Sequence, residues 1–130
     1  MTRRLWDACS CYEQGVPTDQ LLTDQWEACA LGRAVSHEEH LRIARVLLRR
    51  HGREEATRRL VVGTRANCEA MGAPDRFDET LTRRWSAQIA DAEEAGDEET
   101  FDGFIRRHPE VARSDLLGPP EWKVRELRGR

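Results

Sequence analysis

Residues 36–41 of this chain read Ser-His-Glu-Glu-His-Leu. Ser36 is a favoured N-cap residue, and Glu39, three positions later, can complete a capping box with it. From Leu41 onward apolar residues recur at helical spacing, and a glycine follows a last turn that is rich in positive charge. The sequence therefore predicts a helix over residues 36–51.

The inward stripe of this predicted helix begins with two histidines. Continuing the apolar stripe toward the N-terminus reaches His40 and then His37, so we expect both imidazoles to face the core. Arg42, Arg45 and Arg49 fall on the other side of the helix. We expect this arginine face to be solvated.

The composition limits the class of protein. The 130 residues are 38% hydrophobic and 35% charged, and the net charge of −3 comes from interspersed charges of both signs. We therefore expect a globular protein with no nucleic-acid partner. No apolar run approaches the roughly 18 residues of a membrane span, and no signal peptide is visible, so we expect no membrane partner and a cytoplasmic location. The four cysteines are then expected to be thiols or ligands, and the spacing of Cys9 and Cys11 is too tight for a usual zinc knuckle.

Glycine and proline divide the rest of the chain into further helices. Apolar periodicity predicts four main helices, at residues 20–31, 36–51, 53–71 and 77–95. Short helices are expected near both ends of the chain. We predict an all-α fold, an up-down bundle of the four main helices in a single domain over 1–130, with an N-terminal extension over 1–17 and a C-terminal tail over 118–130.

Polar residues concentrate at one pole of the predicted bundle. Short connections favour antiparallel neighbours, so four helix ends meet there. The inward polar residues at those ends are Cys29, His37, His40, Asn67, Cys68 and Asp78, with Glu79 beside the last. The opposite pole carries Leu, Ala, Val and Ile. We expect a buried polar site at the first pole, with Trp85 as a candidate wall.

Such a set of side chains suits two kinds of chemistry. His37, His40 and Asp78 are a plausible ligand set for a divalent metal ion, non-haem iron if positions stay open and zinc if Cys29 or Cys68 joins them. However, two helix N-termini point their positive ends at the same place, which favours an anion. A metal ion with ionised carboxylate ligands and an anionic substrate beside the imidazoles therefore both remain open.

Each candidate residue also has an ordinary structural explanation. Paired histidines at a helix start are often capping or partly exposed residues, and Asp78 can serve only as an N-cap. Glu79 suits the positive end of a helix dipole. Cys29 and Cys68 can be small buried hydrophobic residues.

The motif residues resemble a family of small, largely uncharacterised bacterial helical proteins. Its pattern is similar to His-x-x-His-Leu followed by Tyr-His-Glu-Thr-x-Thr and an aromatic residue. The matching segments here are Ser36 to Leu41, Asn67, Gly72, Phe77 to Thr82, and Trp85, and the resemblance covers roughly residues 20–117. It implies that His37, His40 and Glu79 occupy the family's polar positions. Phe77 replaces the Tyr and Asp78 replaces the third His, so a three-His site would become two His and a carboxylate.

Three functions compete on this basis. The first is a small metal-dependent enzyme acting on a small-molecule substrate, for example in bacterial biosynthesis, with His37, His40 and Asp78 holding iron or zinc and Glu79 either as general base or as a hydrogen-bond partner of the ligands. The second is a metal-free enzyme for an anionic small molecule, with His40 and Glu79 as the acid–base pair. The third is a non-enzymatic helical binding protein. The sequence is compatible with a homodimer.

Overall fold

The computed structural model describes residues 16–94, 96 and 100–129, and this part of the chain is helical without a strand. The α-helices are α2 (Val16–Glu27), α3 (His37–His51), α4 (Arg53–Ala70), α5 (Glu79–Glu94), α6 (Phe101–Arg107) and α7 (Glu121–Arg128). Two 3-10 turns, η1 (Pro74–Arg76) and η2 (Pro109–Ala112), follow α4 and α6. The prediction of an all-α fold is confirmed. The extension before residue 16, with Cys9 and Cys11, lies outside the described residues.

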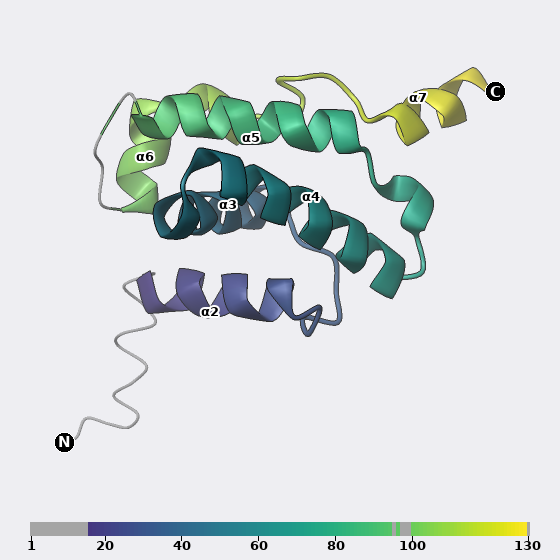
Figure 1. The fold of residues 1–130 in the computed structure, drawn as a ribbon. Helices are drawn as coiled ribbons and strands as arrows, with labels where there is room; N and C mark the ends of the chain where they lie inside the picture. The colour runs from purple at the N-terminus through teal and green to yellow at the C-terminus, as the bar shows by residue number, and fades with distance from the viewer. Residues whose placement is uncertain (1–15, 95, 97–99, 130) are drawn as a thin grey trace.

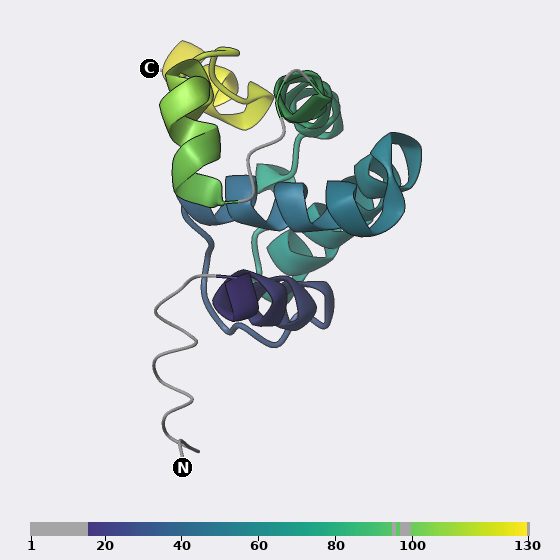
Figure 2. The ribbon, with the colours of Figure 1, turned by 90° about the vertical axis from the view of Figure 1, so that its left-hand side faces the viewer.

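Helices α3 and α4 form the middle of the molecule, between α2 on one side and α5 on the other (Figure 1). Figure 2 looks along α2 and α5 and shows α3 running across both. The up-down alignment of the four main helices is therefore not confirmed. No described helix is long and apolar enough to cross a membrane.

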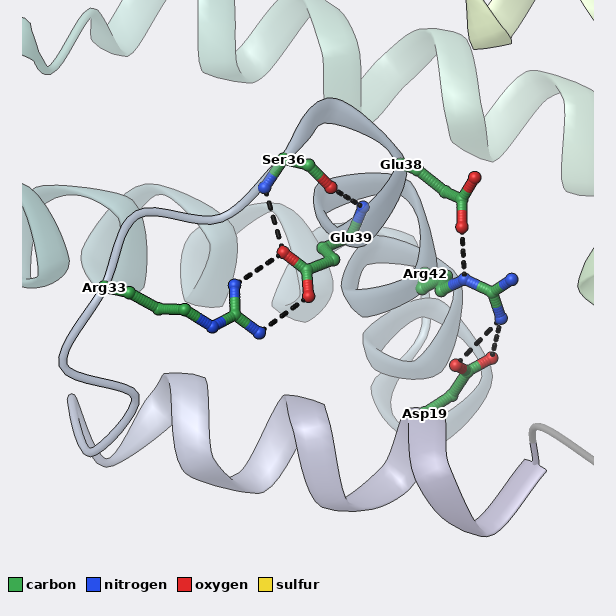
Figure 3. A network of polar contacts seen from close by, with 6 residues as sticks. All are labelled: Asp19, Arg33, Ser36, Glu38, Glu39 and Arg42. Carbon is green, nitrogen blue, oxygen red and sulfur yellow. Dashed lines mark hydrogen bonds and ion pairs between the residues drawn. The ribbon is translucent and has the colours of Figure 1, made fainter. Parts of the chain in front are cut away.

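The start of α3 is fixed by the predicted capping box (Figure 3). Ser36 Oγ accepts a hydrogen bond from the backbone N–H of Glu39 at 3.1 Å, and Glu39 Oε1 accepts one from the backbone N–H of Ser36 at 3.0 Å. Both terminal nitrogens of Arg33 donate to the same carboxylate at 2.8 Å. These hydrogen bonds, above all those from Arg33, lower the pKa of Glu39 to about 2. Glu39 is thus an ionised part of the cap.

The prediction of a solvated arginine face on α3 is wrong for Arg45, because this residue is only 6% exposed. Its Nε donates to Glu93 Oε2 at 2.5 Å, and its guanidinium lies 4.9 Å from the centre of the Phe104 ring. Arg42 likewise stacks at 4.1 Å on the ring of Phe101. The physical reason is that α6 returns over this face, so the arginines are covered and paired with carboxylates.

The contact between α2 and α4 is very close. Trp26 is fully buried, and a Cβ atom added to Gly63 would lie 2.3 Å from the edge of its ring. Asn67 Nδ2 donates to the carbonyls of Trp26 and Gly63, at 2.8 and 2.9 Å. Asn67 therefore completes the C-terminal end of α2 and ties it to α4.

Candidate functional site

A cavity of about 230 Å³ lies on the α5 side of α3 and α4. Its wall comes from α3, α4, η1, α5 and the segment that leads into α7. The lining residues are His37, His40, Leu41, Ala44, Leu60, Thr64, Arg76, Asp78, Leu81, Thr82, Trp85, Ser86, Ile89, Pro120 and Trp122. Four residues singled out from the sequence, His37, His40, Asp78 and Trp85, thus share one mainly apolar cavity.

His37 is held in place by two contacts. Its Nε2 lies 2.8 Å from the carbonyl oxygen of Val111 in η2, and its ring meets the ring of Trp85 edge-on at 4.8 Å. A carbonyl oxygen can only accept, so Nε2 is the donor. In the neutral imidazole the lone pair of His37 then sits on Nδ1.

His40 lies on the cavity wall one turn further along α3. Burial lowers its pKa to about 4, the charge of the neighbouring His37 adds to this effect, and Glu39 opposes it. His40 is therefore neutral at physiological pH, with one donor and one acceptor nitrogen. Within the part of the chain that the structure describes, neither ring nitrogen makes a hydrogen bond, and the residue is half-buried.

The first turns of α5 supply hydroxyl and carboxylate groups to the wall. Asp78 Oδ1 accepts from the backbone N–H of Leu81 at 2.9 Å, which makes Asp78 the N-cap of α5. The hydroxyl of Thr82 donates to the backbone carbonyl of Asp78 at 2.8 Å. Ser86 Oγ and Thr57 Oγ1 share a hydrogen bond of 2.5 Å. These groups contribute polarity to a cavity whose remaining wall is largely apolar.

Glu79 lies outside this cavity. It is exposed, and its carboxylate accepts hydrogen bonds from Arg83 at 2.9 Å and Arg65 at 3.4 Å. Successive residues of a helix point about 100° apart, so Glu79 cannot follow Asp78 onto the cavity side. The structure therefore does not bring Glu79 together with His40.

Three further candidates belong to the α2 side of α4 or its end, and none of them lines the cavity. Asn67 bonds the end of α2, as described above. Cys29 follows α2 in a left-handed conformation, with φ of 56°. Burial raises the pKa of the Cys68 thiol, and the charges of Asp75 and Glu69 add to this, which disfavours a reactive thiolate.

The ligand set predicted for a metal ion is not formed. Among residues 16–94, 96 and 100–129 there is no group of three or more His, Cys, Asp or Glu side chains that could hold a metal ion. One reason is that Asp78 caps α5 and Glu39 caps α3. His37 and His40 remain as two neighbouring nitrogen donors.

Sequence reasoning missed Arg76 and Pro120, which line the cavity together with Trp122. The Arg76 guanidinium lies 4.0 Å from the centre of the Trp122 ring. Neither Arg76 nor Pro120 lies on an apolar helical stripe, so periodicity did not predict either of them as a lining residue. Ser86 was also missed, although its spacing from Thr82 and Ile89 places it on the inward stripe of α5.

A second hollow, of about 410 Å³, lies on the other side of His37, between the start of α3 and α6. His37 and Leu41 line both spaces. The second hollow is bounded by exposed charged residues, Glu38, Asp102 and Arg106. Apart from His37, its polar lining residues are exposed charges, whereas the first cavity combines the two histidines with a larger apolar wall, so the first cavity is the stronger candidate.

No protein-family model, curated protein or solved structure matches this chain. The geometry of the cavity therefore carries the functional argument.

Proposed function

We propose that this protein binds a small, mainly apolar organic molecule in the cavity between α3, α4 and α5. The size of the cavity supports a molecule of about one ring. Its volume is about 230 Å³. An apolar cavity of about 150 Å³ accepts benzene, and sites for drug-sized ligands start at about 300 Å³.

The observation that carries this proposal is the imidazole of His40. It lies half-buried on the cavity wall and is neutral, and it has no hydrogen-bond partner within the described residues. A ligand in the cavity can form a hydrogen bond with this ring without breaking one inside the protein. The ligand should therefore carry an O–H or N–H group that donates to His40, or an acceptor for its N–H.

Binding is better supported than acid–base catalysis. A general base works best when its pKa lies near the operating pH, whereas the pKa of His40 is about 4. The expected partner, Glu79, is engaged with Arg83 and Arg65 at the surface. We therefore take hydrogen bonding, and not proton transfer, as the role of His40.

The experiment is a thermal-shift and NMR titration of the whole protein with phenol, benzoate and aniline. At least one of these probes should bind with a Kd of about 1 mM or lower and raise Tm by a few degrees at saturating concentration. Ala44→Leu fills the cavity and should weaken binding about tenfold or more. Ala87→Leu adds the same atoms at an exposed position of α5 and is the matched control. Equal binding by both variants would place the probe elsewhere and reject the proposal.

A metal-dependent enzyme remains a second candidate, favoured by the hydrogen bond from His37 to Val111. Metal-ligating histidines usually donate their second ring nitrogen to such a carbonyl, which leaves the other lone pair for the metal ion. His37 and His40 supply two ligands, so the bound molecule or Asp78 would have to supply more. Elemental analysis tests this candidate. Less than about a tenth of an equivalent of Fe, Zn, Mn, Ni or Cu after reconstitution would reject it.

A further inference from the structure

Arg76 is the cation at the mouth of the cavity, and its present contacts are with α7. Its guanidinium lies over the Trp122 ring at 4.0 Å, and its Nη2 lies 3.5 Å from Glu126 Oε1. Both charged side chains are about half exposed, at 46% and 53%. An ion pair so long and so open to solvent contributes little free energy. Replacing Glu126 by another carboxylate would therefore cost little.

The stacking on Trp122 has a different consequence. An aromatic face beneath a guanidinium fixes its plane and leaves the N–H groups at its edge available to an acceptor. The planar fork of an arginine matches a carboxylate, and two parallel hydrogen bonds give such a pair both strength and orientation. Trp122 thus holds the Arg76 guanidinium where an acceptor in the cavity can reach its N–H groups. Glu126 now occupies part of that acceptor position.

The other charges around the cavity agree with an anion at this end. Asp78, the carboxylate on the wall, accepts from the N-terminus of α5 through Oδ1, and His40 is neutral. Arg76 is the cationic side chain among the lining residues. The apolar wall, which includes Leu60 and Ile89, suits the ring of a bound molecule.

We propose that the molecule bound in this cavity carries a carboxylate, which Arg76 binds in place of Glu126 while Trp122 keeps the guanidinium in position. This inference rests on the proposed function and narrows it to one class of ligand, a small organic acid with an apolar ring. Glu126 is then an internal competitor for the ligand's carboxylate. Helix α7 follows Gly118-Pro119-Pro120 and lies beyond the N-terminal end of α5 (Figure 1), so it can shift when Glu126 is displaced.

The test compares benzoate with benzamide, which has nearly the same shape and no charge, by NMR titration of the whole protein. Wild type should bind benzoate about tenfold more tightly than benzamide. Arg76→Gln should abolish that preference. Glu126→Gln should tighten benzoate binding about two- to fivefold and leave benzamide unchanged. Arg84→Gln and Glu54→Gln remove the same charges from exposed positions that do not line the cavity, and they should change neither affinity by as much.

The outcomes separate the two proposals. Equal affinity of wild type for benzoate and benzamide, or a Glu126→Gln variant that binds benzoate no better, would overturn the carboxylate inference and leave cavity binding intact. Binding of neither probe, together with no binding of phenol or aniline, would overturn both. Circular dichroism of each variant confirms that its helices are retained, so a loss of binding reports on the cavity.

Discussion

Helix α4 is packed closely on its α2 side and leaves a cavity on its α5 side. On the α2 side, Trp26 packs against Gly63, and Asn67 donates one hydrogen bond to Trp26 of α2 and one to Gly63 of its own helix. On the α5 side, small residues such as Ala44 leave a cavity of about 230 Å³ with His40 on its wall. On the α2 side, Asn67 uses its hydrogen bonds to hold two helices together, whereas on the α5 side the ring of His40 remains available to a bound molecule. The surroundings of a polar residue therefore indicate its role better than its chemical type does.

The substitution with the largest expected effect on stability is Gly63→Ala. Helix propensity alone predicts a gain of about 1 kcal/mol for this change. The added Cβ would lie 2.3 and 2.5 Å from two ring atoms of Trp26, so we expect instead a loss of about 2 kcal/mol or more in the free energy of unfolding, measured with urea. In the background of Trp26→Leu, the same change should cost much less. An unchanged or raised stability of Gly63→Ala would show that the α2 side is not tightly packed.

The next test follows the protonation of His40, on the cavity side of α4. An unfolded histidine has a pKa near 6.5, whereas burial holds that of His40 at about 4. Between these values the unfolded chain binds more protons than the folded one, so stability falls as the pH drops from about 6.5 to about 4. The full effect is at most about 3 kcal/mol. The carboxylate of Glu39, with a pKa of about 2, adds a separate loss only at still lower pH, below about 4.5.

His40→Gln provides the control for this titration. The variant should lose the part of the pH dependence that belongs to His40 and keep the rest. Urea unfolding at a series of pH values measures the difference between the two proteins. Parallel curves for wild type and variant would mean that His40 takes up its proton as easily in the folded state as in water.

Asn67→Ala should have a smaller effect and one confined to stability. It removes the hydrogen bonds to the carbonyls of Trp26 and Gly63, so we expect a loss of about 1–2 kcal/mol in the free energy of unfolding. The affinity for phenol or benzoate should stay within about twofold, because Asn67 does not line the cavity. A loss of binding without a loss of stability would instead show that Asn67 contributes to the binding site.

Local signals predicted most of the fold. The capping box at Ser36 and Glu39 is present as expected, and α3 begins at the next residue. Helix ends were less accurate, since α2 covers Val16–Glu27 where 20–31 was expected. Burial of Arg45 could not be predicted from α3 alone, because the residues that cover it, Glu93 and Phe104, come from distant parts of the chain.

The residues of the candidate site were also predicted only in part. His37, His40 and Asp78 share a cavity because each lies on the inward stripe of its own helix. Asn67 lies on an inward stripe too, but its side chain bonds to the end of α2, and short connections do not tell which neighbour a stripe meets. Cys29 lies after the end of α2. Arg76 and its contacts with α7 have no periodic signal, since Arg76 lies in a 3-10 turn and α5, α6 and η2 separate it from α7 in the sequence.

Glu79→Gln should have the smallest effect, and it tests the boundary of the cavity. The Glu79 carboxylate pairs at the surface with Arg83 and Arg65, and exposed ion pairs contribute about 0–1 kcal/mol. We therefore expect the free energy of unfolding to change by less than about 1 kcal/mol and the affinity for benzoate to stay within about twofold. Chemical denaturation and NMR titration measure the two quantities. A tenfold loss of benzoate affinity, with stability unchanged, would mean that the side chain turns inward when the ligand binds, and it would restore Glu79 to the site that the sequence motif assigned to it.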